Sequence, residues 1–259
     1  MNRHFTNQII NKLLLSTIII NLICFNVTAF YNNLAFLTII TSLVLLLVTL
    51  LTKDKYFLGA LFLFISTLPI YLIFQFFGYS LLYPLILTLI IALPFYGKNI
   101  NQFIRFGNIG TVKIWLAILL ISIISAVSLV LWGLWSNNIG VGEVTVGVYK
   151  DYSILIILFI APTVVILNAV AEEIIFRGII QTELNNIFGN YLSIIFQASL
   201  FASAHVAGGF PNGKIGYAMT FIYAILLGCM RSRTKGLLAP IITHIIADST
   251  IFIFLYCMY

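Results

Sequence analysis

The sequence is dominated by long apolar runs, each close to the length that a helix needs to cross a lipid bilayer. A hydrocarbon core of about 30 Å requires about 20 consecutive apolar residues in helical form. Nine runs come near that length, over residues 9–30, 35–51, 56–77, 80–96, 114–135, 153–187, 191–206, 215–230 and 237–258. Because two of them are short and 153–187 is too long for one straight crossing, we expect eight or nine spans. We expect 9–30 to be retained as the first span rather than removed as a signal peptide.

The scarcity of charge supports the same interpretation. Hydrophobic residues make up 62% of the chain and charged residues only 8%, whereas a soluble globular domain carries about 25% charged residues. So few charges cannot cover a surface that faces water. The sequence therefore predicts an all-α fold, a polytopic transmembrane helical bundle, with membrane lipids as its surroundings.

The basic residues predict how the chain is oriented in the cell membrane. The net charge is +6, and most lysines and arginines lie in short loops between apolar runs. With the N-terminus inside, ten of the 13 fall on inside segments, Lys150 and Lys214 fall outside, and Arg177 lies within a span. Because positive charge is concentrated on the cytoplasmic side of membrane proteins, we expect a multi-pass protein with a cytoplasmic N-terminus. The sequence has no clustered basic face with interleaved aromatic residues, so nucleic-acid binding is not expected.

Ionisable side chains that look central to an apolar run lie in the second half of the chain. A charged group near the middle of a span costs about 2.5–3.5 kcal/mol or more, so it is kept where it pairs, lines a cavity or performs chemistry. We divide the chain into N-terminal transmembrane helices over 1–150 and a C-terminal core over 151–259 that carries almost all of these groups. The core holds Glu172, Glu173, Arg177, Glu183, His205, His244 and Asp248.

The first polar motif is an acidic pair followed by an arginine. Glu173 and Arg177 are separated by four residues, so they share a helical face and can form an ion pair. Glu172 is rotated about 100° from Glu173 and faces something else. One carboxylate is thus neutralised locally and the other remains available. The alternative is a buried ion pair with a spare protonated glutamic acid.

The second motif brings a histidine to the first. A turn at Gly189-Asn190 predicts an antiparallel helical hairpin, with Glu172 lying 17 residues before Gly189 and His205 lying 16 after it. At about 1.5 Å per residue, both lie roughly 25 Å from the tip and at similar depth. The alternative is a histidine that merely packs in the core.

The third motif, His244 and Asp248, again places two polar groups on one helical face. Asp248 can accept a hydrogen bond from the imidazole and fix its tautomer, or the pair can simply lock the last helix. Together the motifs suit peptide hydrolysis: Glu172 and His205 would deprotonate a water, while His244 and Asp248 would bind the tetrahedral oxyanion.

Other hydrolytic chemistries lack their sequence motifs. No G-x-S-x-G elbow and no H-E-x-x-H pattern occur, and no cysteine lies beside a histidine. Two histidines and a carboxylate are also a legitimate catalytic zinc set. The residues alone leave both routes open, although we favour water activation without a cofactor.

The ordered motifs resemble those of the CPBP family, the CAAX protease and bacteriocin-processing group, also called Abi. That family carries E-E-x-x-x-R, then F-x-x-x-H, then H-x-x-x-N/D. The resemblance covers residues ~160–250, and the chain reads Glu172-Glu173-x-x-x-Arg177, Phe201-x-x-x-His205 and His244-x-x-x-Asp248.

The resemblance implies a glutamate-dependent intramembrane endopeptidase over 151–259. Glu172 and His205 would activate water, His244 and Asp248 would form the oxyanion site, and Glu173 and Arg177 would hold the first helix in place. Some family members have asparagine at the position of Asp248. Because an ionised aspartate repels an oxyanion, this departure puts the role of Asp248 in question.

The resemblance also suggests a peptide or protein substrate and a role in bacteriocin or signal-peptide maturation, or in self-immunity. A non-catalytic bacteriocin-immunity or binding membrane protein that kept the fold is the main alternative. A transporter that relays protons through intramembrane carboxylates is a third, weakened by the lack of inverted halves with matching broken helices.

Overall fold

The computed structural model describes residues 3–31, 35–52, 90, 100–138, 154–206 and 210–258. Within these ranges the chain is almost entirely helical and forms no strand, which confirms the all-α prediction for this part of the chain. The predicted run 56–77, and all of the run 80–96 except residue 90, lie outside the described residues, so eight or nine spans stays a prediction. The elements are α1 (Arg3–Phe30), α2 (Ala35–Thr52), α5 (Ile100–Phe103), α6 (Val112–Asn138), α7 (Ile154–Glu172), η3 (Glu173–Ile180), α8 (Gln181–Phe188), α9 (Asn190–His205), α10 (Gly213–Thr234) and α11 (Leu238–Met258).

The long predicted run 153–187 forms one continuous helical segment built from α7, η3 and α8. Pro162 lies inside α7, where its missing N–H and its ring disturb the regular helix. From Glu173 to Ile180 the helix widens into a π-helix, a rare form that often occurs at functional sites. The change of pitch falls on the first polar motif.

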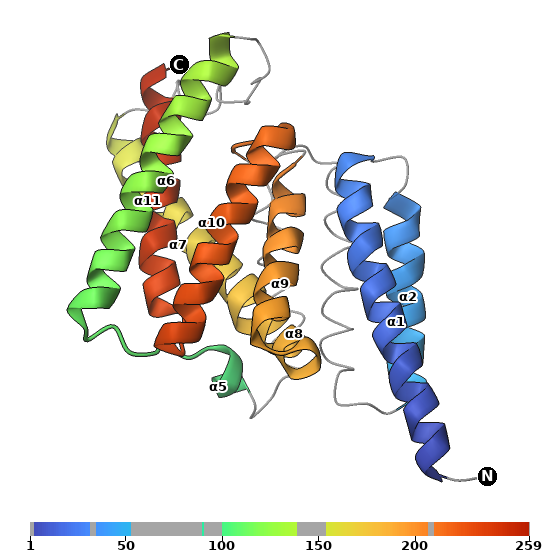
Figure 1. Ribbon diagram of the computed structural model, residues 1–259. Coiled ribbons are helices and arrows are strands. Elements are labelled where there is room, and N and C mark those ends of the chain that lie inside the picture. The colour runs from blue at the N-terminus through green and yellow to red at the C-terminus, as the bar shows by residue number, and fades with distance from the viewer. Residues whose placement is uncertain are drawn as a thin grey trace.

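The described helices form three neighbouring groups (Figure 1). α1 packs against α2 at one side, α9 packs against both α8 and α10 in the centre, and α6 packs against α11 at the other side. α1 also contacts α9, and α7 contacts α11. The second and third polar motifs, on α9 and α11, are therefore both held near the first.

Within the described residues, two helices are long and apolar enough to cross a bilayer by length and composition, Val112–Ser136 within α6 and Gly213–Thr234 of α10. Shorter apolar segments cover Leu15–Val27, Phe36–Leu50 and Leu238–Phe254. The outer side of α6 carries a broad apolar surface of the kind that suits lipid rather than water. Its exposed side chains include Leu116, Leu119, Leu120, Ile123, Ile124, Val127 and Leu131.

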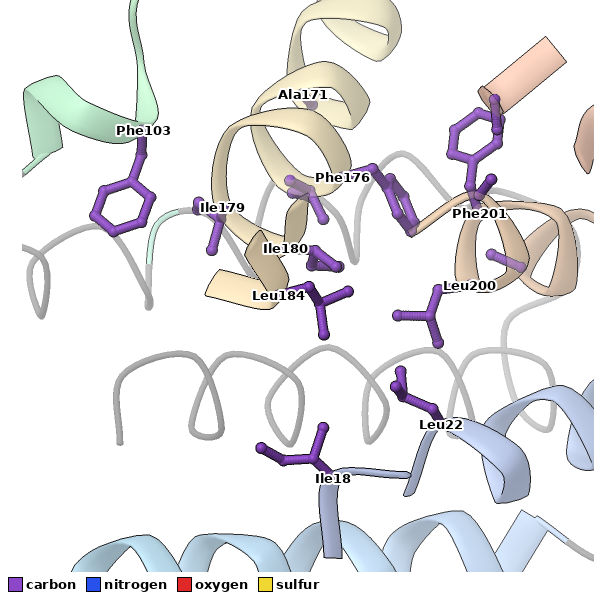
Figure 2. Close-up of a cluster of buried hydrophobic side chains, with 14 of the residues drawn as sticks. Ile18, Leu22, Phe103, Ala171, Phe176, Ile179, Ile180, Leu184, Leu200 and Phe201 are labelled. Carbon is purple, nitrogen blue, oxygen red and sulfur yellow. The ribbon is translucent and has the colours of Figure 1, made fainter. Parts of the chain in front are cut away.

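The main hydrophobic core lies where η3 and α8 meet α9 and α1 (Figure 2). Phe176 of η3 meets Phe201 of α9 edge to face, with ring centroids 4.9 Å apart, and Leu22 of α1 joins the same cluster. Both phenylalanines are at most 5% exposed. This packing fixes Phe201, and Phe201 lies one helical turn before His205.

Polar side chains attach α1 to the central helices. Asn26 Oδ1 accepts hydrogen bonds from Ser203 Oγ at 2.7 Å and from Tyr217 Oη at 3.2 Å, and Ser199 Oγ donates to the same oxygen. Ser203 is therefore engaged by α1 and not by the histidine two residues further along α9.

Candidate active site

The acidic pair lies at the junction of α7 and η3. Glu173 Oε1 is 2.8 Å from Arg177 Nη1, and both side chains are fully buried. The four-residue spacing predicted this ion pair, and the structure confirms it. Glu172, which ends α7, is 3% exposed and points to a different set of partners. One carboxylate is thus paired locally while its neighbour remains available.

Arg177 also connects η3 to α9. Its guanidinium carbon lies 4.3 Å from the centroid of the Phe201 ring, within the range of a cation–π interaction, which is strongest where water is excluded. Its Nε and Nη2 atoms are buried and make no hydrogen bond to the described residues. The aromatic face therefore adds to the stabilisation that this buried cation receives from Glu173.

His244 of α11 lies at the centre of the cluster. Its Nδ1 is 2.8 Å from Glu173 Oε1, the same oxygen that pairs with Arg177. Because a carboxylate only accepts, Nδ1 carries the proton. His244 Nε2 then lies 3.5 Å from Glu172 Oε2 and 3.4 Å from Asp248 Oδ1.

Glu173 therefore fixes the tautomer of His244 through Nδ1, a role that the sequence predicts for Asp248. The predicted contact between His244 and Asp248 is present. It is made by Nε2, the ring nitrogen that does not contact Glu173. Glu173 thus does more than hold its own helix in place, because it links Arg177 to the imidazole. Nε2 faces the carboxyl groups of Glu172 and Asp248. This arrangement is stable only when the imidazole and the two carboxyl groups share protons, because like charges at this range repel each other.

Asp248 has a second partner that the sequence analysis missed. Asn168 Nδ2 donates a hydrogen bond to Asp248 Oδ2 at 3.0 Å. Asn168 precedes Glu172 by one helical turn, in an otherwise apolar segment. A polar amide on that face of a membrane helix was the available signal. Because Asn168 is not ionisable, the cost of a buried charge does not single it out in the sequence.

His205 ends α9, and its ring is held by its own helix. Nδ1 lies 2.9 Å from the Phe201 carbonyl oxygen, and the ring packs against Phe201 with centroids 4.5 Å apart. A carbonyl oxygen only accepts, so Nδ1 is the donor and Nε2 is left as the second ring nitrogen. Among the described residues no ion pair joins His205 to Glu172, although the sequence predicts the two side by side.

The predicted hairpin is confirmed. Gly189, with a φ of 79°, is the single non-helical residue between α8 and α9, and the two helices pack against each other. Glycine adopts such a positive φ without steric cost. The turn returns α9 toward η3, and the two elements are in contact.

A cavity of about 320 Å³ opens beside this cluster. His205, His244 and Asp248 line it, together with apolar side chains of α6, α10 and α11 and the segment 210–211. Glu172 is not among the described lining residues and contacts the cavity wall through His244. The site therefore combines a polar floor with mostly apolar walls.

Two hydroxyl groups in the cavity wall were also missed from sequence. Tyr223 Oη and Thr220 Oγ1, both from α10, are buried and make no hydrogen bond to the described residues. The Tyr223 ring meets the His244 ring edge to face, with centroids 6.0 Å apart. Tyrosine and threonine are common in apolar helices, so no sequence signal marked them.

The remaining predicted ionisable residue lies apart from these contacts. Glu183 is half-buried in α8 and is neither a contact of His244 nor a lining residue of the cavity. Among the described residues, no three or more histidine, cysteine, aspartate or glutamate side chains are arranged to hold a metal ion. The choice between zinc and metal-free water activation stays a prediction.

Comparison with known proteins identifies the class of domain that carries this cluster. Residues 152–250 match the family model described as Rce1-like, type II CAAX prenyl endopeptidase. This match confirms the resemblance to the CPBP group of CAAX proteases. Together with the apolar helices it indicates a membrane protein with a segment similar to that family. No curated protein and no solved structure matches the chain.

Proposed function

We propose that this protein is an intramembrane endopeptidase of the Rce1-like type that hydrolyses peptide bonds with a water activated by Glu172 and His205. One observation carries the proposal. Ionisable groups from α7, η3, α9 and α11 converge beside a cavity of about 320 Å³ that His205, His244 and Asp248 line. Buried charges of this kind are costly in a membrane and mark functional sites.

The first step is the removal of a proton from water. Glu172 Oε2 is buried and makes no hydrogen bond to the described residues, so it can accept one from water. His205 donates through Nδ1 to the Phe201 carbonyl, which leaves Nε2 as an acceptor. One of these two groups takes the proton, and the hydroxide attacks the peptide carbonyl carbon. When the C–N bond breaks, the proton passes to the leaving amine.

The second requirement is stabilisation of the tetrahedral oxyanion. We assign this role to His244 and Asp248. Asn168 Nδ2 donates a hydrogen bond to the Asp248 carboxyl group and thereby orients it. An ionised aspartate repels an oxyanion, so a neutral donor is needed nearby. Tyr223 belongs to the same cavity wall, and its hydroxyl, which makes no hydrogen bond to the described residues, supplies such a donor.

The setting follows from where the basic residues lie. Arg105, Arg231 and Lys235 line one cavity at one end of the bundle. Lys214 begins α10 and lies about 25 Å from Arg231 along that helix. This distribution supports a multi-pass protein of the cell membrane with a cytoplasmic N-terminus. We further propose a peptide or protein substrate in bacteriocin or signal-peptide maturation or in self-immunity, and no cofactor.

The test is cleavage of a quenched fluorescent peptide by the purified protein in liposomes. One peptide ends in a farnesylated cysteine and three further residues, and a second lacks the prenyl group. We expect Glu172→Gln to lower the rate about 10²–10⁴-fold, because it removes the general base with little change in shape. Glu183→Gln, half-buried in α8, is the matched control and should cleave normally.

Two outcomes would oppose the proposal. Equal cleavage by Glu172→Gln and wild type would exclude Glu172 as the base. No cleavage of either peptide by wild type would favour the non-catalytic binding role. A zinc chelator added to the wild-type assay decides the remaining alternative: unchanged activity supports metal-free hydrolysis, and loss that added zinc restores supports a zinc enzyme.

A further inference from the structure

A second cavity, of about 190 Å³, lies at the end of the bundle that carries most of the basic side chains. Three cations line it, and they come from two separate parts of the chain. Arg105 follows α5, whereas Arg231 and Lys235 lie at the end of α10 and directly after it. None of the three belongs to the proposed hydrolytic site.

Backbone contacts hold these two basic segments together. Leu237 N donates to Arg105 O at 2.7 Å, Leu238 N donates to Phe106 O at 3.0 Å, and Asn108 N donates to Thr234 O at 3.0 Å. A Cβ added to Gly236 would lie 2.1 Å from Gly107 N, so a side chain at this point would force the segments apart. The fold therefore keeps Arg105 beside the basic end of α10.

Three positive charges therefore lie close together, and no carboxylate of the described residues pairs with them. Arg231 and Arg105 repel each other electrostatically, and within the described residues none of the three cations forms an ion pair with a carboxylate. The C-terminus of α10 favours positive charge on Arg231 and Lys235, but Arg105 comes from another segment. An anion in the cavity would offset the repulsion.

The cavity also offers neutral groups that can hold oxygen atoms. Gln102, Asn190 and Ser232 also line it. Ser232 Oγ already donates to Asn190 Oδ1, so the amide N–H groups of Gln102 and Asn190 are the neutral donors. Arg231 is half-buried and donates through Nη2 to Thr182 Oγ1, which orients its guanidinium in advance. Arginine's planar set of donors matches the geometry of phosphate oxygens.

We propose that this cavity binds the headgroup phosphate of an anionic phospholipid. Its volume exceeds the roughly 30 Å³ that a water molecule occupies several times over, which leaves room for a phosphate group. The cavity lies at the helix ends, where a headgroup would sit, and basic pockets between membrane helices on the cytoplasmic side bind acidic lipid headgroups. A free phosphate offers the same chemistry, and the experiment separates the two.

The test measures lipid binding to the full-length protein by native mass spectrometry and by thermal unfolding in detergent. Phosphatidylglycerol is compared with phosphatidylcholine and with inorganic phosphate alone. We expect phosphatidylglycerol to bind and stabilise the wild type. The double variant Arg105→Gln/Lys235→Gln should bind about 25-fold more weakly, because each cation near an anionic headgroup contributes about fivefold in affinity.

Arg233→Gln provides the matched control. Arg233 is an exposed cation of the same segment but does not line the cavity, so this variant should bind phosphatidylglycerol as the wild type does. The single variant Lys235→Gln, with an exposed side chain, keeps the test decisive if the double variant unfolds, and should bind about fivefold more weakly.

Three outcomes would overturn the proposal. Equal loss of binding in Arg233→Gln and the double variant would indicate general surface charge and no site. Equal binding of phosphatidylglycerol and phosphatidylcholine would remove the role of the anion. Inorganic phosphate that binds the wild type and excludes phosphatidylglycerol would assign the cavity to a soluble phosphate. None of these readouts depends on peptidase activity.

Discussion

At the scale of single residues, the site depends on which atom of each polar group is already engaged. Glu173 Oε1 is shared by Arg177 and His244, while Glu172 Oε2 makes no hydrogen bond to the described residues. Two neighbouring carboxylates of the same kind thus have different partners. The difference arises because successive residues of a helix face different directions.

Tyr223 gives the sharpest prediction at this scale. Tyr223→Phe removes one buried hydroxyl from the cavity wall and keeps the ring that packs against His244. We expect kcat to fall about 10²–10³-fold, the usual effect of removing one oxyanion donor. KM should change little, because the interaction is made only in the transition state. The measurement is steady-state cleavage of the peptide that wild type hydrolyses.

Tyr191→Phe is the control for that experiment. Tyr191 is 84% exposed, so losing its hydroxyl should leave both kinetic constants unchanged. A Tyr223→Phe enzyme with normal kcat would show that the oxyanion is held by other groups. A raised KM at normal kcat would instead assign Tyr223 to substrate binding.

At the scale of elements, the π-helix η3 joins the helices that carry the other motifs. Arg177 reaches the Phe201 ring of α9, and Glu173 reaches His244 of α11. These contacts tie three elements to a single buried ion pair. The geometry of the site therefore depends on a charge balance as much as on apolar packing.

Breaking that pair should destabilise the protein more than removing it. Arg177→Met leaves Glu173 as a buried carboxylate without its cation, which typically costs about 3–5 kcal/mol. Glu173→Gln/Arg177→Met removes both charges and should recover part of this loss. Thermal unfolding of the two variants in the same detergent measures the difference.

The order of the two thermal unfolding midpoints tests whether the uncompensated Glu173 carboxylate causes the loss of stability. If the double variant unfolds below Arg177→Met, the ion pair is not what stabilises this junction, and the packing of Arg177 on Phe201 must carry more of the energy. Equal midpoints would assign the whole effect to the lost arginine. Only a higher midpoint for the double variant agrees with an uncompensated buried charge.

At the scale of the whole molecule, the described helices place the basic loop residues at one end and Lys214 at the other. The segments around Arg105 and Lys235 are joined by backbone hydrogen bonds, whereas Lys214 lies at the opposite end of α10. This separation is the three-dimensional form of the charge bias in the sequence. It defines which end should face the cytoplasm.

Single introduced cysteines test that orientation in cells. In a chain whose native cysteines are replaced by serine, Lys235→Cys should react with a membrane-impermeant maleimide only after the cells are opened. Lys214→Cys should react in intact cells. Both positions are exposed, so access is governed by the side of the membrane. The reverse pattern would contradict the cytoplasmic N-terminus.

The sequence by itself determined what local helix geometry controls. The ion pair of Glu173 with Arg177 and the contact of His244 with Asp248 were predictable, because side chains four residues apart share a helical face. The Gly189 turn was predictable for a similar reason, since glycine between two apolar runs favours a reversal. The all-α class followed from apolar runs too long and too poor in charge for a soluble fold.

Only the tertiary structure decided which helix faces meet. The bond from Glu173 to His244, the support of Asp248 by Asn168 and the hydroxyl of Tyr223 in the cavity wall join residues far apart in sequence. Such contacts depend on how each helix is rotated about its axis and on where its neighbours pack. Nearly uniform apolar sequence leaves that rotation undetermined, because almost any face of such a helix can pack against another or face lipid.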